Sequence, residues 1–531
     1  MHRPVVMGKN GLVTTAHPLA SLAGLDVLKE GGNAFDAVIA ANAVLGVVHP
    51  GKCGIGGDVF YLLYSSEQKK VFFLNGSGRS PLEASIETVR ARGYDRFPRR
   101  GVLSVTVPGC VHGWSELWKR FGSMPFERLL QPAVYYAREG FPLSHHMAGF
   151  VRENKEIIWQ DGYLRQCFIP RGRPAGPGDV VCQEQLAKTL EAIGKEGAGV
   201  FYKGEIARKI HHYMERKNGL LTQKDLELHS STWGEPLQIT YGDYRIYQTP
   251  PNTQGLAVLL GFNILEGFDL TAMGCDTAEL IHCLVEAKKI AYQHRDQYIT
   301  DPDFVPIEYE DILDKQYASR LRTLINPNFA ASVYEQEELH TNTTFFAAAD
   351  RQGNAAAGIQ SLYAPFGAGC TVDETGIVLQ NRGSCFSLDP THINRLEPHK
   401  RTFHTLTASI VTRDNLPVIV FGASGGNGQP QTHLQVITRL LHFGFNIQEA
   451  IEAPRWLHGS MYFGDNNDYL NMEGRFPLET VAKLESWGHK IRMMDDWASA
   501  AGQAQGIVIK QESGVFAGGA DPRTDGYAAA Y

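Results

Sequence analysis

The feature that most constrains this chain is a pair of apolar runs on either side of a short polar turn. Residues 345–349 read FFAAA, residues 355–359 read AAAGI, and DRQGN lies between them. Asp, Gly and Asn in a short connection between two apolar runs predict a buried β-hairpin. A hairpin that is symmetric about Gln352 pairs Thr343 with Ser361 at its open end.

The overall composition is that of an ordinary globular protein. The chain has 531 residues, of which 43% are hydrophobic and 20% charged, so it can form two or three domains or one large α/β body. The formal net charge of -7 lacks the basic excess of a nucleic-acid-binding protein, and we expect no nucleic-acid partner. The longest nearly apolar run, residues 37–48, is too short to span a bilayer, and no signal-peptide pattern precedes it. We therefore expect no membrane partner.

Neither the cysteines nor the histidines form a pattern that is typical of a metal site. The eight cysteines lack paired spacing, which favours a reduced, cytoplasmic protein without a disulfide framework. His282, His294 and the pair His145 and His146 lie outside any His-Glu-x-x-His motif, so we interpret them as surface or core histidines. Residues 49–64 form a glycine-rich loop that leads into a strand and lacks a Gly-Lys-Ser/Thr ending. We expect neither a metal nor a nucleotide cofactor.

Thr343 has two interpretations on the residues alone. Thr is common in strands and Asn in turns, so TNTT (341–344) can be a loop that enters a sheet. Opposed residues in a hairpin have Cβ atoms ~4.5–5.5 Å apart, so Thr343 can instead pair with the Ser361 hydroxyl and act as a nucleophile. No Gly-x-Ser-x-Gly motif supplies a base, but the α-amino group of an N-terminal Thr has a pKa of ~7.7–8.0 and can take the hydroxyl proton.

Several motifs together resemble those of the γ-glutamyltranspeptidase family. The stretch NTTFFAAADRQGNAAA (342–357) looks like the family's self-cleavage site, whose pattern is Thr-Thr-His-x-Ser followed by Asp-x-x-Gly-Asn. The other matches, in family order, are HPLASLAGLDVLKEGGNAFDA (17–37), HPGKCGIGGD (49–58), VPGCVHGW (107–114), GLLTQKDL (219–226), PPNTQG (250–255), EAKKIAY…RDQY…DP (286–302), GASGGNG (422–428) and DPRTDG (521–526). The resemblance covers essentially the whole chain.

The resemblance implies a fold and a maturation step. The fold is the N-terminal-nucleophile hydrolase fold, an α/β four-layer αββα sandwich that forms a single large body. The precursor is expected to cut itself between Asn342 and Thr343. This cut gives a large chain, 1–342, and a small chain, 343–531, with Thr343 at its N-terminus.

The same resemblance implies four catalytic residues. Thr343 matches the family's nucleophile, and Ser361 matches a hydroxyl that forms a hydrogen bond with it. Gly425 and Gly426 match the two glycines whose backbone N–H groups form the oxyanion hole. Consecutive glycines allow the backbone to direct two donors at one point, which agrees with this role.

The substrate-binding positions depart from the family pattern. Thr405 falls on one of two serines that contact the substrate carboxylate, and His404 replaces the other. In the loop QNRGSCFS (380–387), Arg382 and Cys385 stand where the family has an amide and a carboxylate that hold the γ-glutamyl α-amino group. An arginine and a thiol do not recognise an ammonium group.

The family's carboxylate-binding arginine is also absent. Ser77 stands at its position, with Arg79 two residues further on. We expect Arg79 and Tyr363 to belong to the substrate-binding residues. Arg382 has a planar guanidinium that suits a carboxylate, although a structural ion pair is an alternative explanation for it.

We therefore predict a self-processing amide hydrolase that acts through a Thr343 acyl-enzyme. Its predicted substrate is a small amide whose acyl group carries a carboxylate, such as an oxamate-like, glutaryl or adipyl amide. Two alternatives stay open: a true γ-glutamyltransferase or glutathione hydrolase, and an uncleaved, inactive relative that serves as a scaffold or binding protein. The expected partners are the amide substrate and the two chains of one precursor, and the resemblance leaves a homo-oligomer open.

Overall fold

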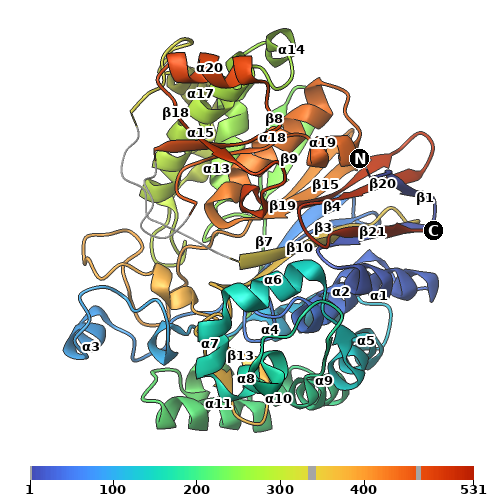
Figure 1. The fold of residues 1–531 in the computed structure, drawn as a ribbon, viewed down its shortest axis with the longest axis vertical. Helices are drawn as coiled ribbons and strands as arrows, with labels where there is room; N and C mark the ends of the chain where they lie inside the picture. Colours follow the sequence, from blue (N-terminus) through green and yellow to red (C-terminus); the bar gives the residue numbers. More distant parts are fainter. Residues whose placement is uncertain (1–2, 333–341, 462–467) are drawn as a thin grey trace.

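The computed structural model describes residues 3–332, 342–461 and 468–531. Two seven-stranded sheets stack face to face at the centre, and helices cover the outer face of each sheet (Figure 1). The predicted four-layer α/β/β/α sandwich is therefore confirmed, and its layers form one body. No helix among the described residues is long and apolar enough to cross a membrane.

The strands of both sheets pair antiparallel. The first sheet contains, in spatial order, β1 (Val6–Gly8), β20 (Val515–Ala520), β19 (Gln503–Lys510), β15 (Leu416–Ser424), β14 (Ala408–Arg413), β9 (Tyr244–Gln248) and β8 (Leu237–Tyr241). The second sheet contains β21 (Tyr527–Ala530), β2 (Gly11–Thr15), β10 (Asn342–Asp350), β11 (Ala355–Tyr363), β3 (Asp58–Ser65), β4 (Lys70–Gly76) and β7 (Thr232–Gly234).

Each sheet combines strands from both sides of the 342–343 bond. In the second sheet, β10 and β11 lie between β2 and β3, which precede them by about 300 residues in the chain. In the first sheet, β9 pairs with β14, and β1 pairs with β20. The two segments 1–342 and 343–531 therefore build one common core.

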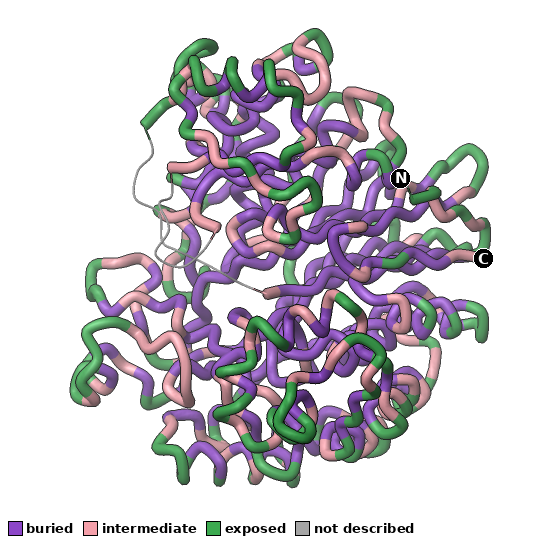
Figure 2. The backbone as a smooth tube through the Cα atoms, in the orientation of Figure 1, coloured by how far each residue is buried: buried purple, intermediate pink, exposed green. Residues whose placement is uncertain are grey.

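The alternation of side chains along β10 fills two different cores. Phe345 and Ala347 belong to the apolar layer between the two sheets, whereas Phe346 and Ala348 belong to the layer between the second sheet and its helices. Both layers are continuously buried (Figure 2). Gly422 of β15 belongs to this packing, because a Cβ atom there would lie 2.2 Å from the Phe345 ring. The Phe345 ring occupies the space that a side chain at position 422 would take, which lets the two sheets approach closely.

The helices divide into two groups, one for each sheet. The second sheet is covered by α1 (Pro18–Lys29), α2 (Ala34–Val48), α4 (Cys110–Phe121) and α5 (Phe126–Glu139), and the first by α13 (Gly255–Leu265), α15 (Ala278–Tyr298), α18 (Gln429–His442) and α19 (Ile447–Glu452). Helix α2 begins with a capping box in which the Asn33 side chain accepts from the backbone N–H groups of Phe35 and Asp36. Its alanine-rich surface allows close packing against β10 and β11.

Candidate active site

Hairpin β10–β11 holds Thr343, which is buried, at its open end. The pairing runs from Thr344 opposite Gln360 to Ala349 opposite Ala355, which is the register predicted from the sequence. The Asp350 side chain closes the turn by accepting from the backbone N–H groups of Gln352 and Asn354. Both strands are almost fully buried, so the predicted hairpin is confirmed.

A β-bulge changes the pairing at the open end of the hairpin. Asn342 pairs with Tyr363, and the register shifts between Asn342 and Thr344. The Ser361 hydroxyl donates to the carbonyl of Asn342 and accepts from the Tyr363 N–H at 2.7 Å. The expected hydrogen bond between the Ser361 and Thr343 hydroxyls is therefore not formed in the uncut chain. The buried Thr343 Oγ1 has no hydrogen-bond partner among the described residues.

A cavity of about 730 Å³ opens beside this bulge. Asn342, Thr343 and Gly425 all line it. Gly425 follows β15 with a φ of 128°, a conformation that favours glycine. The Gln254 side chain fixes the loop from behind, because its Nε2 donates to the carbonyl of Gly426 at 2.9 Å and also to that of Thr405. The structure thus brings the predicted nucleophile and the predicted oxyanion loop to one place.

Four of the predicted substrate-binding residues form a second cluster. Arg382 begins the short 3-10 helix Arg382–Cys385 and is fully buried. Its guanidinium lies 4.2 Å from the centre of the Tyr363 ring. Its Nη1 donates to Thr405 Oγ1 at 3.5 Å and to Cys385 Sγ at 3.9 Å. The Nε and Nη2 atoms of Arg382 have no hydrogen-bond partner among the described residues.

His404 joins this cluster through Asp58, which sequence reasoning missed. The His404 Nε2 lies 2.9 Å from Asp58 Oδ2, and Asp58 Oδ1 accepts from the backbone N–H of Gly78 at 3.0 Å. Burial raises the pKa of Asp58 to about 7, while the charge of Arg382 opposes that rise. Burial and Arg382 together hold the pKa of His404 well below its usual value, so the ring is neutral.

Arg79 lies apart from this cluster. Its Nη1 is 2.8 Å from Asp301 and its Nη2 is 2.5 Å from Asp303. Within the described part of the chain, no hydrogen bond or ion pair joins the Arg79 side chain to any of the other five predicted residues. The structure therefore places five of the six predicted substrate-binding residues together and leaves Arg79 in a separate ion-pair group.

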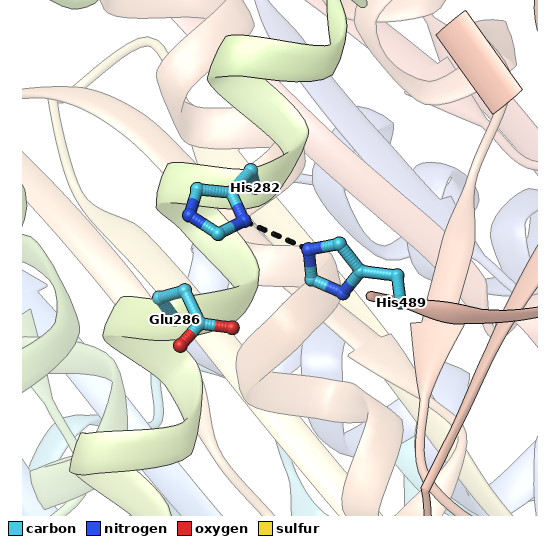
Figure 3. Close-up of side chains that lie close together, drawn as sticks. All are labelled: His282, Glu286 and His489. Atoms are coloured by element: carbon cyan, nitrogen blue, oxygen red, sulfur yellow. Dashed lines mark hydrogen bonds between the residues drawn. The ribbon is translucent and has the colours of Figure 1, made fainter. Parts of the chain in front are cut away.

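The described residues contain one group that has the composition of a metal site. His282 and Glu286 lie one turn apart on α15, and His489, the residue before β18 (Lys490–Met494), approaches them (Figure 3). Each has a protein partner: His282 Nδ1 lies 2.8 Å from His489 Nε2, His282 Nε2 lies 2.7 Å from the Asn326 carbonyl, and Glu286 pairs with Lys289 at 2.7 Å. A cation could bind here only by breaking these hydrogen bonds and the ion pair, and it would then lie close to the Lys289 ammonium.

A profile described as Gamma-glutamyltranspeptidase matches residues 20–531 of this chain. The chain belongs to the γ-glutamyltranspeptidase family. It is 41% identical to a glutathione hydrolase-like YwrD proenzyme of Bacillus subtilis, over 98% of this chain and 99% of that protein. It is 33% identical to an oxamate amidohydrolase proenzyme of Klebsiella pneumoniae, with 98% of each chain covered. A crystal structure of cephalosporin acylase from Bacillus halodurans has a TM-score of 0.93 and 39% identity, and covers 100% of this chain and 97% of that one.

The place of this chain in the γ-glutamyltranspeptidase family confirms the predicted resemblance, fold and enzyme class. It is an N-terminal-nucleophile amide hydrolase or transferase, and relatives with amidohydrolase and acylase names are among its matches. The names of the relatives also include the word proenzyme, which agrees with the predicted maturation into two chains.

Two groups in the site had a weak sequence signal or none. Asp58 is the last residue of the motif HPGKCGIGGD, but its partner His404 is 346 positions away. Gln254 lies within PPNTQG, which resembles a family motif, and only the fold shows that it links the loop of Gly426 to Thr405.

Proposed function

We propose that this chain cuts itself before Thr343 and then hydrolyses amides whose acyl group ends in a carboxylate. The observation that carries this proposal is the free edge of Arg382. Its Nε and Nη2 are adjacent donors on one side of the guanidinium, and they are buried without a partner among the described residues. Such an edge matches the two oxygens of a carboxylate.

The bulge supports the maturation step. Thr343 Oγ1 adds to the carbonyl carbon of Asn342, the peptide nitrogen of Thr343 leaves as an amine, and an ester forms. Water then hydrolyses this ester and releases the Asn342 carboxylate with a free Thr343 hydroxyl and α-amino group. The Ser361 hydroxyl donates to the carbonyl oxygen of Asn342, where negative charge develops during the addition.

Turnover uses the same hydroxyl with the new amino group as its base. The amine of Thr343 takes the hydroxyl proton as Oγ1 attacks the substrate carbonyl, and it returns a proton to the departing amine. Water hydrolyses the acyl-enzyme and releases the acid. The N–H groups of the Gly425–Gly426 loop are the proposed donors to the oxyanion, because this loop lines the same cavity as Thr343.

The surroundings of Arg382 support an acyl carboxylate over a γ-glutamyl group. A γ-glutamyl acyl group also carries an ammonium, which Arg382 repels. Asp58 is the carboxylate that interacts with Arg382, but its oxygens accept from Gly78, Gly109, Gln380 and His404. Asp58 is therefore already engaged by four groups of the fold, three on Oδ1 and His404 on Oδ2.

The first experiment tests the nucleophile. On a denaturing gel, the wild-type chain is expected to give two bands, with Thr343 at the N-terminus of the smaller piece, and Thr343→Ala is expected to stay in one piece. Thr344→Ala is the matched control, because Thr344 is equally buried and its hydroxyl also lacks a partner in the described chain. Wild-type protein that stays uncut, or Thr343→Ala that is cut, would contradict the proposal.

The second experiment tests the acyl group. The matured enzyme is given a glutaryl anilide, a butyryl anilide without the carboxylate, a γ-glutamyl anilide and oxamate. We expect the glutaryl anilide or oxamate to react fastest and the γ-glutamyl anilide to be poor. Efficient γ-glutamyl turnover that is insensitive to Arg382→Met would favour a glutathione hydrolase instead.

A further inference from the structure

The cavity beside Thr343 has a basic wall. Lys52, Arg99 and Arg100 line it together with the imidazoles of His145 and His146, against the single acid Glu153. The chain as a whole carries a net charge of -7, so this local excess does not follow from composition. These residues come from three separate parts of the sequence, namely the loop before β3, the segment after α3 (Ile86–Ala91) and helix α6 (His145–Glu153). The fold has gathered them at one surface of the catalytic cavity.

Lys52 is a buried ammonium group, and the two carboxylates that act on its charge, Asp525 and Glu153, form no ion pair with it. Its exposure is 3%, and no carboxylate among the described residues lies within ion-pair distance of its Nζ. Nζ donates to His146 Nε2 at 2.8 Å and lies 5.2 Å from the centre of the Phe150 ring. An ammonium has three donors, so two stay available for a ligand.

The electrostatics keep Lys52 charged at neutral pH. Burial lowers the pKa of Lys52 to about 8, and burial together with Lys52 lowers the pKa of His146 to about 3. The imidazole is therefore a neutral acceptor that holds the ammonium in place. A buried charge of this kind is costly unless an opposite charge approaches it.

The position of Lys52 assigns it to one half of a bound amide. Its loop is attached to β11 beside Ser361, because the Leu362 N–H donates to the Lys52 carbonyl at 3.3 Å. Arg382 is fully buried and does not line the open cavity, whereas Lys52 does. An amide that reacts at Thr343 extends in two directions from its carbonyl. With the acyl group directed toward Arg382, the amine half enters the cavity and meets the basic wall.

We propose that Lys52, held by His146, binds an anionic group on the amine half of the substrate. The ligand class is a carboxylate carried by the leaving amine, as in an amino acid or an aminobenzoate. This inference rests on the proposed amide hydrolysis at Thr343. It adds a second anionic group to the substrate, on the opposite side of the scissile bond from the one that Arg382 binds.

The test uses two substrates that share one acyl group and differ only in the amine. Glutaryl anilide and glutaryl 3-aminobenzoate are compared in the wild type, in Lys52→Met, in Lys52→Arg and in Lys9→Met. Lys9 is exposed and does not line the cavity, so its variant controls for the change in net charge. Inhibition by free aniline and free 3-aminobenzoate is measured with the same proteins.

We expect the wild type to favour the carboxylated amine by about 10- to 100-fold in kcat/KM, mainly through KM. In Lys52→Met this ratio should fall to near one, while Lys52→Arg keeps part of it and Lys9→Met all of it. Equal inhibition of the wild type by aniline and 3-aminobenzoate would overturn the proposal, and this measurement does not require that any Lys52 variant folds. A Lys52→Met enzyme that loses both substrates equally, or that discriminates glutaryl from butyryl less well, would also overturn it.

The outcome is separable from that of the proposed function. If the enzyme prefers a different acyl group, the amine pair is built on that group and the same ratio is measured. Arg382→Met should change the acyl preference and leave the amine ratio intact.

Discussion

Two buried arginines of this protein have opposite surroundings. Arg523 uses all five of its N–H donors: Nε and Nη2 bind the carboxylate of Glu473 at 2.6 Å, and the remaining donors bind Asp521 and the carbonyls of Ile451 and Ala453. Arg382 is at least as buried, but of its nitrogens only Nη1 forms hydrogen bonds among the described residues, and both are long. Arg523 stabilises the fold through these bonds, whereas we propose that Arg382 uses its unpartnered Nε and Nη2 to bind a substrate.

The same contrast appears in the acids beside the two arginines. Burial alone would raise the pKa of Asp521, but Arg455 and Arg523 hold it below its usual value. Burial raises the pKa of Asp58 to about 7 despite Arg382. The first acid is fully compensated by positive charge, and the second is not. The comparison predicts that substitutions in the first group change stability, and that substitutions near Arg382 change activity.

The largest expected effect is on stability, for Arg523→Met. The substitution leaves Glu473 and Asp521 buried without their main partner, so we expect the free energy of unfolding to fall by about 3–5 kcal/mol. Urea unfolding followed by circular dichroism measures the loss. Arg475→Met is the control, because Arg475 also pairs with Glu473 but is partly exposed, and we expect a loss of about 1 kcal/mol or less. Equal losses for the two variants would break the comparison.

The next largest effect is on activity, for Arg382→Met. We expect kcat/KM for carboxylate-bearing amides to fall by about 30- to 4,000-fold, which corresponds to about 2–5 kcal/mol. Unfolding by urea should change little, because Arg382 has weak partners to lose. Arg382→Lys keeps the charge without the planar edge and should restore only part of the rate. A large loss of stability with unchanged selectivity would make Arg382 a structural residue like Arg523.

A smaller effect is expected for Ser361→Ala. This change removes the donor to the Asn342 carbonyl, so self-cleavage should slow by about 10- to 100-fold, or ~1.4–2.8 kcal/mol. The rate is read from the time course of the two bands on a denaturing gel, with circular dichroism as the check on folding. An unchanged time course would mean that the hydrogen bond in the bulge does not assist the cut.

The smallest expected effect is on stability near neutral pH, and it concerns the hydrogen-bonded pair His282 and His489. Burial lowers the pKa of both, that of His489 to about 3, while the unfolded chain titrates near ~6.5. The unfolded state therefore binds more protons below pH ~6.5, so the stability from these rings is present above that pH and is lost as the pH falls toward 3. His489→Gln should show a shallower decline in urea midpoint between pH 7 and 4. Identical pH profiles would contradict a neutral, closed pair.

The parts of the site that the sequence predicted are those set by local pattern. The turn residues and the alternation around Gln352 fixed the pairing from Thr344 to Ala349, because register follows from side-chain period and turn chemistry. The shift at Asn342 was not predictable, since it depends on how the Tyr363 backbone binds the Ser361 hydroxyl. Because of the bulge, the Ser361 hydroxyl donates to the Asn342 carbonyl and not to the Thr343 hydroxyl.

Electrostatic partners were the least predictable part. Arg382 was predicted from its place in a loop. Whether all of its N–H groups have hydrogen-bond partners depends on segments that are distant in the sequence. The Arg79 guanidinium, in contrast, has ion-pair partners, because it binds Asp301 and Asp303, which lie more than 200 positions away in the sequence. Lys52 lies in the motif HPGKCGIGGD, but its hydrogen-bond partner His146 is 94 positions away. Spacing along the chain carries no information about such pairs.

The interleaving of strands from residues 1–342 and 343–531 has a consequence for the life of the matured protein. Strand β10 would acquire a free end while β2 and β11 still hold it on both sides, so a cut at its first residues leaves the folded body intact. Once that body is unfolded, however, two separate polypeptides have to find each other, and recovery becomes concentration-dependent. Unfolding of the matured protein is then effectively irreversible. Its lifetime is set by the rate of unfolding and not by an equilibrium between folded and unfolded chains.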